Sequence, residues 1–232
     1  MKNFSALLAI ILMATPAVLS AAAFEGKVQM TMTDAKGRSV PMELWVKDGF
    51  VRAEMDTGKG EKMAMITDEK KQEMITLMPG QNMYMTIDLK GVAERVAKSS
   101  NEGSFEKTGE TQKILGYTCT KYIFKSKDGT SEIWATEDLG KFVGTGLFGG
   151  GRMGGKRSAA SIPAWQKALM EKDLFTLRVV SLNPKGKKQF RLDVVKIEKG
   201  PQADALFAPP PGAQKFSFGG MMKGLGLPGM KR

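Results

Sequence analysis

The sequence contains no histidine and only one cysteine, Cys119, in 232 residues. Without histidine, the chain cannot build a Ser-His-Asp or Cys-His catalytic set or an imidazole zinc site. A single cysteine cannot form a disulfide within the chain. The sequence also shows no nucleophilic side chain with an identifiable general base. We therefore expect a protein that is not an enzyme and that uses no cofactor.

Long apolar runs are absent except at the N-terminus. There, Lys2 supplies a positive charge, Ala6–Met13 is apolar, and Ala21–Ala23 offers the small residues that signal peptidase accepts. We predict that residues 1–23 are a signal peptide, that cleavage follows Ala23, and that the mature protein is periplasmic. No cysteine follows the apolar run, so we do not expect a lipoprotein.

Acidic residues are few compared with basic ones, 24 against 35, which gives a net charge of +11. In an exported protein this charge favours an anionic membrane surface over nucleic acid as the partner. A glycine-rich segment, predicted to be a mobile surface loop, carries Arg152, Lys156 and Arg157. We predict that this basic loop faces the membrane. The alternative, that the basic residues only keep the surface solvated, stays open.

Apolar and polar residues alternate through most of the first hundred positions, which is the period of β-strands. For example, Val28, Met30 and Met32 alternate with polar neighbours. Turn signals such as Asp48-Gly49 separate short strands, as in antiparallel hairpins. We therefore predict an antiparallel meander in the first half of the chain.

The second half adds two hairpins and two short helices. We expect the helices at Gly91–Ser99 and Ile162–Lys172, where apolar residues have helical spacing. The strands are expected at residues 114–125 and 131–136, joined at Asp128-Gly129, and at residues 175–182 and 189–198, joined at residues 183–186.

A twisted antiparallel sheet of eight to ten strands has to curl, and something must fill its concave face. The predicted fold is therefore mainly β (α+β), a curved antiparallel sheet forming a half-open barrel with a few short lid helices. We expect one domain at residues 24–212, followed by a Gly- and Met-rich flexible tail at residues 213–232.

The 17 methionines are unusual, because strands ordinarily favour Val and Ile. By alternation, nine of them can face one side of the sheet, and eight are predicted to line the wall of a cavity. Methionine is flexible and polarizable, so such a wall adapts to apolar guests of different shapes. The predicted wall consists of Met30, Met32, Met42, Met63, Met65, Met74, Met83 and Met85, and Met78 is the ninth methionine.

Two other interpretations of the methionines stay open. They can simply fill an irregular core, which is the usual role of methionine in strands. They can also bind a soft metal ion, because thioethers select Cu(I) and the residues of a Met-x-Met pair project together from a strand. Three such pairs occur: Met30 with Met32, Met63 with Met65, and Met83 with Met85.

Two parts of the sequence resemble a known family. One is the run from Gly109 to Tyr122 with the segments Glu132–Ala135 and Asp138–Gly140, and the other is the ending Ala205–Gly212. They resemble an exported bacterial domain family of unknown function that is related to the periplasmic lipoprotein carriers LolA and LolB. The resemblance covers roughly Phe24 to Gly212. It implies a half-barrel with a helical lid around an apolar cavity, which holds acyl chains in the carriers.

These observations favour a non-catalytic periplasmic protein that binds lipid or another hydrophobic ligand. The expected partners are a lipid or acyl chain and an anionic membrane surface, and nucleic acid is not expected. The alternatives are an envelope module that docks or senses a protein partner through sheet edges and the glycine-rich loop, and binding of Cu(I) or Ag(I) through the methionine pairs.

Overall fold

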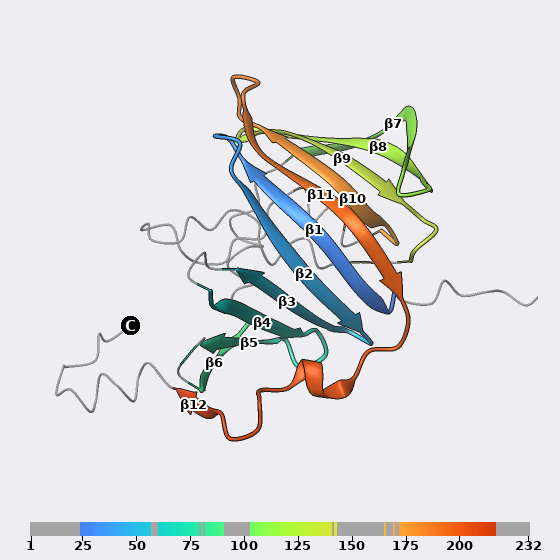
Figure 1. Ribbon diagram of the computed structural model, residues 1–232. Helices are drawn as coiled ribbons and strands as arrows, with labels where there is room; N and C mark the ends of the chain where they lie inside the picture. The colour runs from blue at the N-terminus through green and yellow to red at the C-terminus, as the bar shows by residue number, and fades with distance from the viewer. Residues whose placement is uncertain are drawn as a thin grey trace, which may run out of the picture.

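The computed structural model describes residues 24–56, 60–78, 80, 82–90, 103–140, 142, 165, 169 and 172–216. These residues form a single sheet of twelve strands in the order β12-β6-β5-β4-β3-β2-β1-β11-β10-β9-β8-β7 (Figure 1). Neighbouring strands are antiparallel except β12 and β6, which run parallel. The fold is therefore mainly β, as predicted.

The strands follow the chain with short connections in the first half. Their bounds are β1 Gly26–Asp34, β2 Ser39–Lys47, β3 Phe50–Asp56, β4 Lys62–Asp68, β5 Glu73–Met78, β6 Met83–Asp88, β7 Gly103–Ile114, β8 Tyr117–Ser126, β9 Gly129–Thr136, β10 Phe175–Leu182, β11 Lys188–Lys199 and β12 Gln214–Phe216. One short 3-10 helix, η2, spans Asp204–Phe207.

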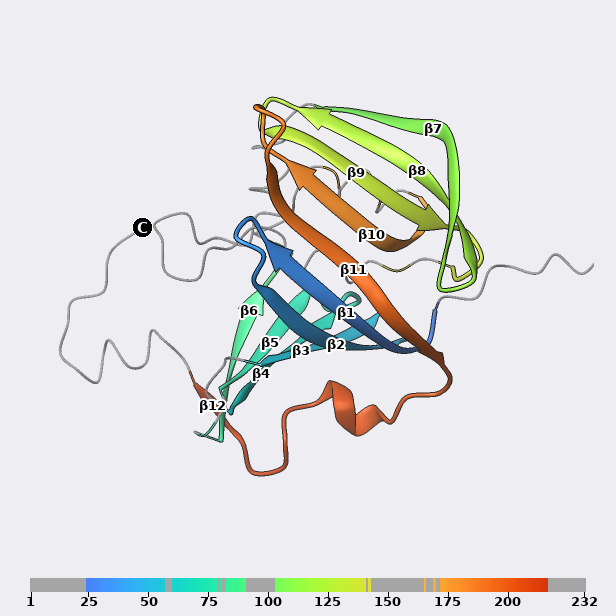
Figure 2. The same ribbon diagram turned by 45° about the horizontal axis from the view of Figure 1, so that its top comes forward.

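The sheet is open and strongly curved, as the sequence predicted. In Figure 2, β7–β10 form one arm and β3–β6 the other, and β11, β1 and β2 connect them. The strands number twelve rather than the expected eight to ten. We call the concave side of this curved sheet its inner face, and both arms contribute side chains to it.

The hairpin turns agree with the sequence signals. Asp48 and Gly49 both have positive φ, 43° and 83°, as a two-residue type I′ turn requires. In the turn between β10 and β11, the Asn183 side chain accepts hydrogen bonds from the backbone N–H groups of Lys185 and Lys187. These turns set the register of the strands that follow them.

Two expectations about the sheet were incomplete. Residues 103–113 were not predicted as a strand, yet they form most of β7, the edge strand, whose exposed residues lack regular alternation. The predicted tail at residues 213–232 begins with an ordered strand, because Gly212 turns at φ +79° and the backbone N–H of Gln214 donates to Asn82 O at 2.9 Å. Residues 217–232 lie outside the described residues.

The predicted lid helices are not confirmed. Gly91–Ser99 lies outside the described residues, and of Ile162–Lys172 only Trp165, Leu169 and Lys172 are described. Trp165 and Leu169 have helical conformation and are buried in the main core. Within the described part of the chain, no helix is long and apolar enough to cross a membrane.

The core lies on the inner face. Val28 and Leu44 pair across β1 and β2, and Ile133 and Val179 pair across β9 and β10, all fully buried in one cluster. Phe24, Phe142 and Phe175 add three contacting rings, two of them stacked with centroids 4.7 Å apart.

The chain after β11 crosses the outer side of the β3–β6 arm to reach β12 (Figures 1 and 2). Phe207 of η2 is buried, and its ring centroid lies 5.7 Å from that of Phe50. Arg52 Nη1 donates to Leu206 O at 2.8 Å. We call residues 200–213 the strap, because they pack along the outer side of this arm.

Candidate functional site on the inner face

A row of methionines crosses the inner face from β1 to β6. Met30 lies opposite Met42, Met42 opposite Met55, and Met55 opposite Met63. Ala64 pairs with Leu77, which places Met63 and Met78 at adjoining positions of this row, and Met78 lies opposite Met83. We call these six residues the methionine row. Directly opposed residues have Cβ atoms about 4.5–5.5 Å apart, so neighbouring thioethers can touch.

The other predicted wall residues share the same face. Met32 continues the face of β1, Met65 and Met85 both pair with Thr76, and Met74 pairs with Thr67. The alternation that the sequence showed therefore places all nine predicted methionines on one side of the sheet. Met55 was not among them, although it continues the alternation of Val51 and Ala53 on β3.

Burial divides the methionines into two groups. Met30 and Met42 are 1% exposed and belong to the main core cluster, where they fill space between apolar neighbours. Met74 is also buried. The remaining members of the face are only half-buried: Met32, Met55, Met63, Met65, Met78, Met83 and Met85. The methionines of the row on β1 and β2 therefore belong to the closed core, whereas those on β3–β6 remain partly accessible to solvent.

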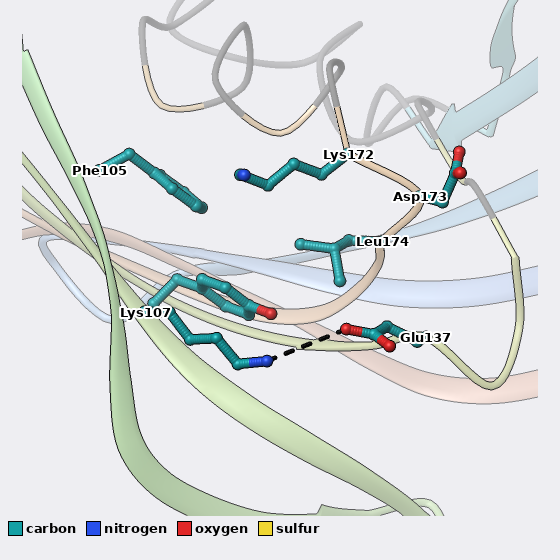
Figure 3. A pocket seen from close by; sticks show the side chains of 7 residues that line it. Phe105, Lys107, Glu137, Lys172, Asp173 and Leu174 are labelled. Atoms are coloured by element: carbon teal, nitrogen blue, oxygen red, sulfur yellow. Dashed lines mark ion pairs between the residues drawn. The ribbon is translucent and has the colours of Figure 1, made fainter.

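A cavity of about 560 Å³ lies at the opposite arm, between β7, β8 and the segment before β10 (Figure 3). Its volume is within the range of about 300–1,000 Å³ that small-molecule pockets have. Apolar groups come from two strands and one loop, and charged groups surround them. The described lining residues are Phe105, Lys107, Tyr122, Glu137, Lys172, Asp173 and Leu174.

The apolar part of the cavity consists of packed side chains. The rings of Phe105 and Tyr122 stack with centroids 5.3 Å apart and an interplanar angle of 19°. Phe105 pairs with Phe124 across β7 and β8, so the strand ladder fixes its position. Tyr122 and Leu174 are buried at 4% and 5% exposure. An apolar ligand would therefore meet a preformed surface.

The charged part of the cavity is exposed. Lys107 Nζ lies 4.0 Å from Glu137 Oε1 and 6.0 Å from the centroid of the Tyr122 ring. Lys172 Nζ lies 5.7 Å from the centroid of the Phe105 ring. Both ammonium groups thus lie beside aromatic rings, an arrangement that keeps charge next to an apolar surface.

Sequence reasoning did not find this cavity. None of the eight predicted wall methionines is among its described lining residues. Its members lie between positions 105 and 174, and Phe105 occurs in a polar stretch without strand alternation. No local signal marks such a site. The predicted membrane-facing residues Arg152, Lys156 and Arg157 lie outside the described residues.

Cys119 offers no reactive group in this structure. It is fully buried in the core cluster, and its Sγ lies 3.6 Å from Tyr117 O. Burial raises the pKa of the Cys119 thiol, which keeps the thiol protonated at neutral pH. Among the described residues, no three Asp, Glu, Cys or His side chains gather where they could hold a metal ion.

These features define a class of protein: a curved, open antiparallel sheet with an apolar inner face and a cavity at one arm. The chain belongs to the family described as domain of unknown function DUF4412, whose model matches residues 24–213. The expected resemblance, to a family of unknown function with this type of sheet, is thereby confirmed. No curated protein matches the chain.

Solved structures with a similar fold include an uncharacterized conserved protein from Thermus thermophilus. It is 14% identical with a TM-score of 0.50, over 83% of this chain and 90% of that one. The MucA/MucB complex of Pseudomonas aeruginosa matches with 13% identity and a TM-score of 0.44, over 79% of this chain and 55% of that one. The lipoprotein LppX of Mycobacterium tuberculosis matches with 9% identity and a TM-score of 0.35, over 77% and 89%. Of these three, only the Thermus thermophilus protein reaches a TM-score of 0.50, and at 14% identity it concerns the fold alone.

Proposed function

We propose that this protein is exported and binds a lipid or another hydrophobic ligand on the inner face of its sheet, without catalysis. The cavity of about 560 Å³ with its buried apolar side chains carries the proposal. The resemblance to LolA and LolB supports it, because those carriers hold acyl chains in a half-barrel. The signal peptide at residues 1–23, with cleavage after Ala23, belongs to the same proposal.

Burial of apolar groups supplies enough free energy for an acyl chain to bind. Each buried CH₂ group contributes about 0.8 kcal/mol, so a chain of ten carbons in contact with the cavity gains on the order of 8 kcal/mol before the entropy of binding is subtracted. Phe105, Tyr122 and Leu174 supply the contact at the cavity. The half-buried methionines of β3–β6 offer a second apolar surface on the same side of the sheet.

The direct test is to purify the protein from the envelope of its producing cell, extract it with solvent, and identify lipids by mass spectrometry. Binding of the neutral fluorescent probe N-phenyl-1-naphthylamine to delipidated protein then locates the site. We expect Phe105→Glu to weaken probe binding by at least about tenfold, because it places a charge on the apolar wall. Val195→Glu, a change at a position 50% exposed on β11, is the matched control. Absence of both lipid and probe binding contradicts the proposal.

A second candidate function, binding of Cu(I) or Ag(I), is favoured by the methionine row. Thioethers are soft ligands that select Cu(I). Met55, Met63, Met78 and Met83 come from four successive strands and are half-buried, so several sulfurs can approach one ion.

Anaerobic titration of Cu(I) against the competing chelator bicinchoninate tests this second function. We expect Met63→Leu combined with Met65→Leu to abolish uptake, and Met30→Leu, in the closed core, to leave it unchanged. Wild-type protein that takes no Cu(I) from the chelator excludes the metal function and leaves the lipid proposal intact.

A further inference from the structure

Among the described residues that line the cavity between β7, β8 and β10, two charged side chains form no ion pair, Lys172 and Asp173. Lys172 extends from the segment before β10 toward Phe105, and its ammonium lies 5.7 Å from the centroid of that ring (Figure 3). Within the described part of the chain, no carboxylate forms an ion pair with Lys172. Its positive charge therefore faces the cavity, and no carboxylate of the described residues is paired with it.

The other charges of the cavity are arranged differently. Lys107 already has Glu137 as a partner at 4.0 Å. The carboxylate of Asp173 is turned away from the ammonium of Lys172 in Figure 3. An anion that enters the cavity thus finds Lys172 available, whereas Glu137 is held beside Lys107.

Aromatic and apolar groups lie next to this ammonium. Phe105 stacks on Tyr122, and Leu174 is buried two residues after Lys172. A single ligand can therefore place an apolar chain against these groups while its charged end reaches Lys172. A neutral lipid would fill the same apolar surface but would not satisfy the ammonium.

We propose that the cavity selects amphiphiles with an anionic headgroup, a carboxylate or a phosphate, which Lys172 binds while the apolar chain packs against Phe105, Tyr122 and Leu174. This inference rests on the proposed function and adds the ligand class. Because the ammonium is exposed to solvent and salt, selectivity of about tenfold is expected rather than a larger factor.

The experiment compares three ligands with equal acyl chains: palmitate, palmitoyl lysophosphatidate and monopalmitoylglycerol. Each displaces N-phenyl-1-naphthylamine from the delipidated protein below its critical micelle concentration. We expect both anionic ligands to bind about tenfold more tightly than the neutral one at low salt. Lys172→Gln should remove this preference, so that the two anionic ligands bind no more tightly than monopalmitoylglycerol. Lys113→Gln, which removes an exposed lysine from β7 outside the cavity, is the matched control.

The outcomes separate this inference from the proposed function. Equal affinity for all three ligands, or a preference that survives Lys172→Gln, overturns the headgroup assignment while hydrophobic binding stands. Failure of all three ligands and of the probe to bind overturns the proposed function as well. A preference for palmitate alone or lysophosphatidate alone supports the inference and identifies the headgroup. Circular dichroism of each variant confirms that it is folded.

Discussion

Met42 of β2 lies directly opposite Met55 of β3, and this pair marks the boundary between the closed core and the accessible part of the methionine row. Met42 is 1% exposed, whereas Met55 is only partly buried against the core. The same residue type therefore serves as core filling on one strand and as accessible apolar surface on the next.

Truncation separates these two roles. We expect Met42→Ala to lower the free energy of unfolding by about 2–5 kcal/mol, because it leaves a cavity in a packed core. Met83→Ala, at the half-buried end of the row, should lower it by less than about 1 kcal/mol. Urea unfolding followed by circular dichroism measures both. Equal losses for the two variants would show that the whole row is closed core.

Oxidation gives an independent measure of the same boundary. Hydrogen peroxide converts accessible methionine to the sulfoxide, and burial protects the thioether. We expect Met63, Met65, Met83 and Met85 to oxidise before Met30 and Met42. Peptide mass spectrometry after a timed exposure measures the oxidation of each methionine. A lipid that binds to the protein should slow the oxidation of any methionine that it covers. Oxidation of Met30 at the rate of Met83 would contradict the structure.

Strands with one apolar and one polar face could be predicted from the sequence. A strand whose two faces are both polar could not. Alternation in β1 and β2 follows from one buried and one solvated face, and both strands were predicted. β7 is a mostly exposed edge strand with a register irregularity between Lys107 and Thr111, so its sequence carries no such pattern.

The candidate site was predictable only in part, for a related reason. Alternation decides which face a methionine occupies, but it does not decide register, so the order of the methionine row and the burial of each member were unknown. The cavity depends on contacts between Phe105, Tyr122 and Leu174, which lie far apart in the chain. Tertiary pairing alone brings them together.

An ion cluster on the outer face predicts how stability depends on pH. Asp193 of β11 accepts hydrogen bonds from Arg178 Nε at 2.7 Å and from Arg191 Nη2 at 2.8 Å. Burial alone would raise the pKa of Asp193, but the hydrogen bonds and charges of both arginines outweigh burial and hold this pKa below its usual value. The carboxylate therefore stabilises the fold above pH ~4 and loses this effect as pH falls through the lowered pKa.

Asp193→Asn removes this charge. We expect a loss of about 1–3 kcal/mol in the free energy of unfolding at pH 7, since hydrogen bonds to charged groups are lost. The difference from wild type should shrink below pH ~4, where the carboxylate becomes protonated. Urea unfolding between pH 3 and pH 7, chosen to bracket the usual Asp pKa of about 3.9, measures both effects. Glu106→Gln, on exposed β7, is the control, and a pH-independent deficit would reject the role of the charge.

The strap predicts a local effect on the arm that carries the accessible methionines. Phe207 packs on Phe50, and Arg52 holds the neighbouring carbonyl of Leu206. Phe207→Ala should lower the free energy of unfolding by about 3 kcal/mol, the lower end for a buried phenylalanine, because this position lies at the edge of the fold. Hydrogen exchange should speed up in β6 and β12 more than in β1 and β11, since the strap leads directly into the β12–β6 pairing. Val195→Ala, at an exposed position of β11, is the control. Uniform acceleration across all strands would mean that the strap stabilises the whole sheet rather than this arm.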